Sequence, residues 1–232
     1  MPVSHRKYLD RADAGRHLAS LLATWKGTGA VVFALPRGGV PVAVEVAKAL
    51  KAPLDLLYVR KIGAPLEPEL ALGAIVDGDD PDIVLNDAVI ARLGVAQDVV
   101  HDIMARELKE IERRRAKYGA SLGSLTPTGR PAIIVDDGLA TGASMRAAVK
   151  ALRRRGATRV VVAVPVAPPD AVEGLEADGA EVVCPLVADR FFGVGAYYLD
   201  FRQLSDEEVG EALEQLRRTG TGRATGVSQP AD

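Results

Sequence analysis

The most chemically informative residues of the chain are two adjacent carboxylates, Asp136 and Asp137, which directly follow an apolar run. The segment 131–144 reads PAIIVDDGLATGAS, so a turn of small and hydroxylated residues comes after the carboxylates. Because adjacent side chains in an extended chain point apart, only one or two carboxylates can converge on a ligand. Such a pair is sufficient to hold the vicinal hydroxyls of a ribose or a metal ion.

The turn after the carboxylates has the composition of a phosphate-binding loop. It consists of Ala140, Thr141, Gly142, Ala143 and Ser144, and a helical pattern starts within it. The first backbone N–H groups of a helix have no partner inside the helix, and the helix dipole adds positive charge there. Gly138 and Gly142 allow the close backbone approach that a bound phosphate requires. An ordinary strand-to-helix turn is the alternative, but a cap needs one polar residue rather than this whole array.

A second loop has the same position relative to its own strand. Pro36, Arg37, Gly38 and Gly39 follow the apolar run AVVFAL and precede a helical pattern, which offers one guanidinium together with flexible amides. A sharp turn that uses glycines to begin a helix is the alternative. Arg60 and Lys61 follow a third apolar run and offer further positive charge. An ordinary solvated end of a strand is the alternative for these two residues.

Short Val/Ile/Leu-rich runs alternate with helical patterns, which predicts an α/β fold with a mostly parallel five-stranded sheet. The expected strands are Ala30–Leu35, Leu54–Arg60, Ala132–Val135, Val160–Val164 and Glu181–Val187. In such a sheet the ligand site lies beyond the carboxyl ends of the strands, where both loops would fall. Helices are expected over Val40–Leu50 and over Ser144–Arg155, the second capped by Gly156.

The middle and the end of the chain depart from this alternation. Leu72–Asn86 reads as two short strands around a turn, which predicts an antiparallel flap, and a long helix is expected over Gln97–Lys117. Ser205 and Glu208 form a capping box that opens a terminal helix. Half of the aromatic residues lie in the segment 191–201, which favours either a lid or a compact loop that closes the core.

The segment 131–144 closely resembles the phosphoribosyl-pyrophosphate (PRPP) motif of type I phosphoribosyltransferases, in which an apolar strand precedes two acidic residues and Ala-Thr-Gly-x-Ser/Thr. The resemblance implies a three-layer α/β fold in which Asp136 and Asp137 bind the ribose hydroxyls. It implies that Gly138 and the turn Ala140–Ser144 surround the 5′-phosphate. In that family the second acidic residue is also suggested as a proton acceptor, and Asp137 stands at that position.

The loop of Arg37, Gly38 and Gly39 looks like the pyrophosphate loop of the same family, where a cis peptide is expected. Lys61 stands where related enzymes have a basic residue near the pyrophosphate. Further segments, 60–76, 112–119 and 191–209, resemble a branch of predicted bacterial phosphoribosyltransferases whose substrate is not established. Residues 188–203 would then form a small hood.

The resemblance implies transfer of phosphoribose from PRPP to a nitrogen nucleophile such as a nucleobase, with release of pyrophosphate. Asp136, Asp137 and Arg37 would be the catalytic residues. No dedicated metal site is expected, because Mg²⁺ would arrive with the substrate and lie near Asp136. A homodimer is common among similar proteins. Two alternatives stay open: a non-catalytic regulatory protein that binds PRPP or a nucleotide, and a phosphosugar hydrolase, for which the sequence singles out no water-activating base.

Composition narrows the setting in which this chemistry would occur. The chain of 232 residues has 29 basic and 31 acidic residues, a formal charge of −2, which does not favour a general nucleic-acid binder. No apolar run is long enough for a membrane helix and no secretory signal is evident. The single cysteine, Cys184, favours a reduced, cytoplasmic protein. We expect one domain over residues 1–218 and a disordered tail over 219–232.

Overall fold

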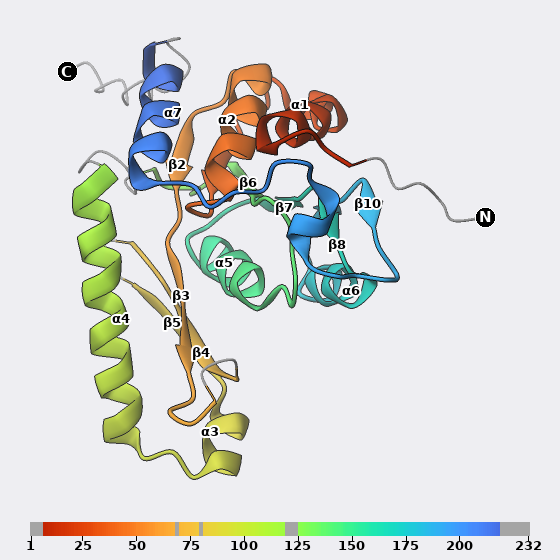
Figure 1. The fold of residues 1–232 in the computed structure, drawn as a ribbon. Helices are drawn as coiled ribbons and strands as arrows, with labels where there is room; N and C mark the ends of the chain where they lie inside the picture. The colour runs from red at the N-terminus through yellow and green to blue at the C-terminus, as the bar shows by residue number, and fades with distance from the viewer. Residues whose placement is uncertain (1–6, 68–69, 79–80, 119–124, 219–232) are drawn as a thin grey trace, which may run out of the picture.

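The core of the protein is a parallel five-stranded sheet with the strand order β2-β1-β6-β7-β9 (Figure 1). The computed structural model describes residues 7–67, 70–78, 81–118 and 125–218. The strands of this sheet are β1 (Val31–Ala34), β2 (Leu54–Leu56), β6 (Pro131–Val135), β7 (Arg159–Ala163) and β9 (Glu181–Val183). The predicted α/β class is therefore confirmed.

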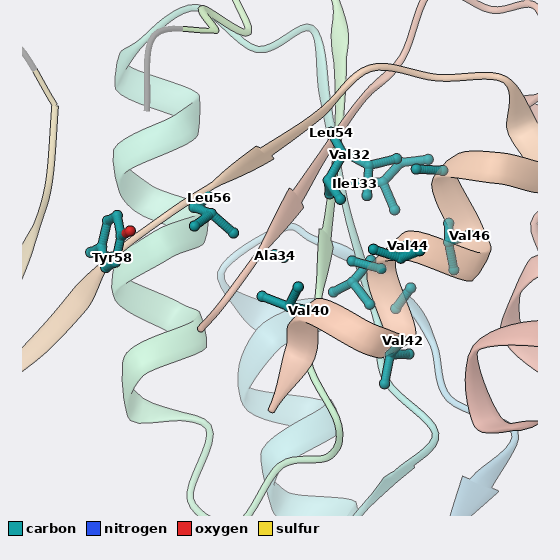
Figure 2. Packing of buried hydrophobic residues seen from close by; sticks show 14 of the residues in the cluster. Val32, Ala34, Val40, Val42, Val44, Val46, Leu54, Leu56, Tyr58 and Ile133 are labelled. Atoms are coloured by element: carbon teal, nitrogen blue, oxygen red, sulfur yellow. The ribbon is translucent and has the colours of Figure 1, made fainter. Parts of the chain in front are cut away.

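Helices cover both faces of the sheet and make a three-layer arrangement. Alternating residues of β1 pack to opposite sides, with Val32 in one buried cluster and Val31 in the other. The first cluster includes side chains of α2 (Gly39–Leu50), α4 (Gln97–Tyr118) and α7 (Asp206–Arg218), together with Leu18 of α1 (Arg11–Leu21). Figure 2 shows valines of α2 beside side chains of β1, β2 and β6. The second cluster involves α5 (Ala143–Arg154) and α6 (Pro169–Ala177).

The flap is a three-stranded antiparallel sheet of β3 (Val59–Gly63), β4 (Ala71–Val76) and β5 (Asp82–Leu85), followed by α3 (Asp87–Leu93). The long helix α4 runs along these strands (Figure 1), and its predicted extent is confirmed to within a residue. The predicted flap, Leu72–Asn86, contains β5 and nearly all of β4, and the structure adds β3 to it.

The expected single strand Leu54–Arg60 is wrong, because β2 ends at Leu56 and β3 belongs to the flap. The backbone N–H of Tyr58 donates to Asp77 Oδ1 at 2.7 Å, and the N–H of Asp77 donates to the Tyr58 carbonyl at 2.9 Å. These bonds tie Tyr58 to the end of β4 rather than to the parallel sheet. The chain after Leu56 thus pairs with residues distant in sequence, and local apolar composition does not reveal these partners.

Proline residues end two strands of the parallel sheet. The expected strand Glu181–Val187 is wrong: it divides into β9 and β10 (Leu186–Val187) on either side of Cys184 and Pro185. Proline has no N–H to donate to a strand ladder. Pro165 likewise follows β7 and precedes β8 (Val166–Ala167), and β8 pairs with β10 in a separate two-stranded parallel sheet.

The hood, residues 188–203, packs around an aromatic cluster that includes the beginning of the described chain. Tyr8 donates its N–H to the Tyr197 carbonyl at 2.9 Å and accepts from the Leu199 N–H at 2.8 Å. Tyr8, Tyr197 and Tyr198 are buried, whereas Phe192 is 83% exposed. The short helices η1 (Ala23–Trp25) and η2 (Val194–Tyr197) complete the elements of the described residues.

Two predicted helix ends are confirmed. Gly156, just beyond α5, has a φ of +82°, as a capping glycine requires. Ser205 N–H donates to Glu208 Oε2 at 2.8 Å and Glu208 N–H donates to Ser205 Oγ at 3.2 Å, which is the capping box at the start of α7.

No helix in the described part of the chain is both long and apolar enough to span a membrane. The predicted tail, 219–232, lies outside the described residues.

Candidate active site

Two loops meet at the carboxyl edge of the parallel sheet, one after β1 and one after β6. Leu35 N–H donates to the Val135 carbonyl at 3.0 Å, so the two strand ends are paired up to the last residue. A Cβ at Gly38 would lie 2.2 Å from Asp137 Oδ2, and a Cβ at Gly39 would lie 2.6 Å from the Val135 carbonyl oxygen. Both positions therefore need glycine, because the first loop lies directly against the second.

The side chain of Asp137 is held by Arg11, the first residue of α1. Arg11 Nε donates to Asp137 Oδ2 at 2.8 Å, and Arg11 as a whole is only 9% exposed. The hydroxyl of Tyr198 in the hood donates to the Asp137 carbonyl at 2.7 Å. Asp137 N–H donates to Asp136 Oδ1 at 2.8 Å. The two predicted carboxylates thus lie at a junction of the sheet, α1 and the hood.

The electrostatics of this junction differ between the two carboxylates. Burial and the negative charge of Asp137 hold the pKa of Asp136 well above its usual range. Burial also raises the pKa of Asp137, but the Arg11 guanidinium opposes that shift. Arg11 therefore favours ionisation of Asp137 over ionisation of Asp136. Burial raises the pKa of Tyr198 so far that its hydroxyl stays protonated and can donate.

The predicted phosphate loop leads directly into the first turn of α5. Gly138 and Gly142 have φ values of +155° and +70°, which favour glycine. Leu139 is buried, and its N–H donates to the Val166 carbonyl at 2.9 Å, which anchors the loop. The residues on the outside of the turn are exposed: Ala140, Thr141, Ala143 and Ser144. Their side chains and the first N–H groups of α5 are therefore accessible to an anion.

The remaining predicted residues, Arg37 and Lys61, have different neighbours. The peptide bond between Pro36 and Arg37 is cis. The Arg37 guanidinium lies 3.6 Å from Asp206 Oδ1 at the start of α7. Lys61 belongs to β3 and lines a cavity of about 350 Å³ between the flap and α5. Ser144 of the phosphate loop lines the same cavity, so the flap is brought beside that loop.

Arg11, Tyr198 and Asp206 are the residues at this site that the sequence did not indicate. Each is more than 60 positions from Asp137 in the sequence and lies outside the two loop motifs. The aromatic cluster that contains Tyr198 favoured a segment that closes a site, but nothing in the sequence assigns its hydroxyl to the Asp137 carbonyl. Arg11 and Asp206 follow ordinary helical patterns, so no local signal distinguishes them from surface charges.

Asp136 and Asp137 are the residues here that could contribute ligands to a magnesium ion. Within the ranges that the structure describes, no three His, Cys, Asp or Glu side chains are grouped so that they could hold a metal. Asp136 and Asp137 offer carboxylate oxygens, the ligand type that Mg²⁺ prefers, and two carboxylates alone do not complete its octahedral shell. Oxygen atoms of a bound phosphate compound would have to supply the other ligands.

Comparison with known proteins decides the family. The model of the phosphoribosyl transferase domain matches residues 7–202. The chain belongs to the phosphoribosyltransferase family. The family is the one that the resemblance of the segment 131–144 implied, and the five-stranded parallel sheet with an additional antiparallel sheet is the α/β fold expected from that resemblance.

Proteins similar to this chain match most of its length. A Mycobacterium tuberculosis (strain CDC 1551 / Oshkosh) protein, provisionally named a phosphoribosyl transferase, is 47% identical over 209 residues. That match covers 90% of this chain but 47% of the relative, so the chain spans about half the length of its curated relative. The crystal structure of TT1426 from Thermus thermophilus is similar with a TM-score of 0.79 and 44% identity, covering 90% of this chain and 99% of that one.

Proposed function

We propose that this protein transfers phosphoribose from PRPP to a nitrogen nucleophile, a nucleobase or related heterocycle, and releases pyrophosphate. One observation supports this proposal above the others: the glycine loop after β1 lies against Asp137, beside the loop that opens α5. The glycine loop after β1, the carboxylate pair and the loop that opens α5 are thereby contiguous. PRPP presents a pyrophosphate, a ribose and a 5′-phosphate in that order.

The roles of the residues follow from this order. Thr141, Ser144 and the first N–H groups of α5 would bind the 5′-phosphate, with Gly138, Ala140, Gly142 and Ala143 supplying the backbone. Asp136 and Asp137 would orient the ribose hydroxyls. Mg²⁺, when bound with the substrate near Asp136, would neutralise part of the pyrophosphate charge.

The pyrophosphate would be received at the loop after β1. Arg37 and the N–H groups of Gly38 and Gly39 are the proposed donors, with Lys61 reaching from the flap. They would stabilise the charge that develops when the bond between C1 of the ribose and the pyrophosphate oxygen breaks. The lone pair of the acceptor nitrogen forms the new bond to C1, and the proton of that nitrogen passes to Asp137 or to water.

Exclusion of water matters because the transition state at C1 resembles an oxocarbenium ion that water can trap. The hood, whose Tyr198 donates to the Asp137 carbonyl, and the flap, which lines a cavity together with Ser144, are the proposed covers. We place the reaction in the cytoplasm, on a single domain that includes the described residues, and in a homodimer.

A calorimetric titration of PRPP with and without Mg²⁺, followed by a pyrophosphate-release screen across free nucleobases, tests the proposal. Magnesium-dependent binding with release stimulated by one base is the expected result. Binding without release for any base would instead favour a regulatory PRPP-binding protein, and release without a base would favour a hydrolase. Absence of binding would overturn the assignment of the two loops.

A pair of arginine variants tests whether pyrophosphate release depends on Arg37. Arg37→Gln should lower pyrophosphate release by about tenfold or more, since it removes one charge-assisted donor to the leaving group. Arg113→Gln is the matched control, because Arg113 is an exposed residue of α4 that pairs with Glu110. Equal activity of both variants would remove Arg37 from the mechanism.

A further inference from the structure

Arg11 makes three interactions that join separate parts of the molecule. Its Nε donates to Asp137 Oδ2 at 2.8 Å, and its Nη1 donates to the Arg202 carbonyl at 3.0 Å. Its guanidinium carbon lies 4.0 Å from the centre of the Phe201 ring. The side chain itself begins on α1 and is nearly buried. One guanidinium therefore connects α1, the hood and the carboxylate pair.

A second connection between the hood and the carboxylate pair runs parallel to Arg11. The Tyr198 hydroxyl donates to the backbone carbonyl of Asp137 at 2.7 Å, and the Tyr198 ring lies 4.9 Å from that of Phe201. A Cβ at Gly138 would lie 2.6 Å from Val194, so the hood also packs against the residue after Asp137. The backbone and the side chain of Asp137 are thus both fixed by hood residues or by Arg11.

We propose that Arg11 is a positioning residue that couples the hood to Asp137, so that movement of the hood changes the orientation of the ribose-binding carboxylate. The guanidinium fork suits this task because it is planar and can donate in two directions while one face stacks on an aromatic ring. A lysine at this position could neutralise Asp137 but could not hold Asp137, the Arg202 carbonyl and Phe201 together. The consequence for catalysis rests on the proposed function, whereas the coupling itself needs no substrate.

Hydrogen–deuterium exchange on the full chain, with no substrate added, tests the coupling by itself. In Arg11→Met, amide exchange should accelerate by about tenfold both in the hood segment 197–202 and in the segment 136–142, because one bonded network holds both. Strand β7, residues 159–163, is the internal reference and should exchange as in the wild type. Arg16→Met is the matched control, since Arg16 lies on the same helix, is 56% exposed and pairs only weakly with Asp13 at 3.5 Å.

Arg11→Lys keeps the positive charge but removes the planar guanidinium. It also provides a second variant for the case in which Arg11→Met does not fold. It should keep the segment 136–142 closer to wild-type exchange than the segment 197–202. Faster exchange confined to α1 and the hood in Arg11→Met would show a purely structural role and overturn the proposal. Wild-type exchange in both segments of Arg11→Lys would overturn the requirement for a fork.

Titration of PRPP with Mg²⁺ then connects the coupling to the site. The dissociation constant for PRPP should rise by about tenfold in Arg11→Met and by about threefold in Arg11→Lys, with kcat reduced more strongly than the KM of the acceptor is raised. If the wild-type protein does not bind PRPP, the proposed function fails while the exchange experiment still decides the coupling. If the wild type binds PRPP and Arg11→Met binds it equally well, Arg11 does not position Asp137 for the ribose.

Discussion

The guanidinium of Arg37 lies 3.6 Å from the Oδ1 atom of Asp206, so the arginine proposed to receive pyrophosphate faces a carboxylate. Asp206 is the first residue of α7 and also pairs with Lys117 of α4. The position of α7 is in turn fixed by the Ser205 capping box and by buried Val209, Leu213 and Leu216. A bound pyrophosphate would therefore compete with Asp206 for Arg37.

Replacement of Asp206 by asparagine should strengthen PRPP binding. The competing carboxylate is lost, and an ion pair of this exposure contributes at most about 1 kcal/mol, so the gain should be about twofold to fivefold in the dissociation constant. Calorimetric titration in the presence of Mg²⁺ measures it. Glu214→Gln, which removes the ion pairs of Glu214 with Arg217 and Arg218 on the same helix, is the control and should bind as the wild type does. Weaker binding by Asp206→Asn would mean that Asp206 positions Arg37 instead of competing for it.

A methyl group at Gly38 should disrupt the site more than the fold. The added Cβ of Gly38→Ala would overlap Asp137 Oδ2, which must move and strain its bond to Arg11. We expect PRPP affinity to fall by about tenfold or more, with a destabilisation of about 1–3 kcal/mol in urea unfolding. Gly210→Ala, in α7 with open space around it, should be neutral or stabilise by about 0.5–1 kcal/mol. Wild-type PRPP affinity in Gly38→Ala would contradict the close contact of the two loops.

An Asp137→Asn variant should lose turnover more than it loses stability. The amide still accepts a hydrogen bond from Arg11, but the buried guanidinium loses its counter-charge, which should cost about 1–3 kcal/mol. Turnover should fall by about 100-fold or more, because the variant can neither orient the ribose as a carboxylate does nor accept a proton. Steady-state pyrophosphate release and urea unfolding measure the two effects, and the exposed Asp98→Asn serves as control. Unchanged turnover would remove Asp137 from the mechanism.

Asp77, which directly follows β4 of the flap, should make the stability of the protein depend on pH. This carboxyl is 3% exposed and its Oδ2 accepts no hydrogen bond from the described residues. Burial raises its pKa from 3.8 to about 6, against the opposing charges of Arg115 and Arg155 and with a small contribution from Asp55. The folded protein therefore binds more protons than the unfolded chain between about pH 4 and 6, and stability is lost as the pH rises through that window.

Asp77→Asn removes this titration while its amide oxygen can still accept from the Tyr58 N–H. Relative to the wild type, the variant should gain stability as the pH rises from about 4 to about 6, by up to about 3 kcal/mol, and the difference should be constant above that range. Urea unfolding at several pH values measures the difference. Asp102→Asn, an exposed change on α4, should show no such trend, and a flat difference for Asp77→Asn would contradict a buried titrating carboxyl.

The sequence by itself determined the parallel sheet and the two loops at its edge. Apolar runs with helical patterns between them specify buried parallel strands, and the loops after the carboxyl ends of such strands are where a ligand site is expected. Asp136, Asp137 and the turn Ala140–Ser144 could be predicted because all are adjacent in the chain. The capping box of Ser205 was predictable for the same reason, since it is a bond between residues three apart.

Tertiary structure alone decided which distant residues hold that site. Arg11 reaches Asp137 across 126 positions of the chain, and Asp77 accepts from the Tyr58 N–H across 19 positions, where the chain passes from the parallel sheet to the flap. Arg37 faces Asp206 only because α7 packs beside α2. In each case the energy of the contact depends on burial and on the partner's position in space, and neither quantity is encoded in the local pattern of side chains around the residue.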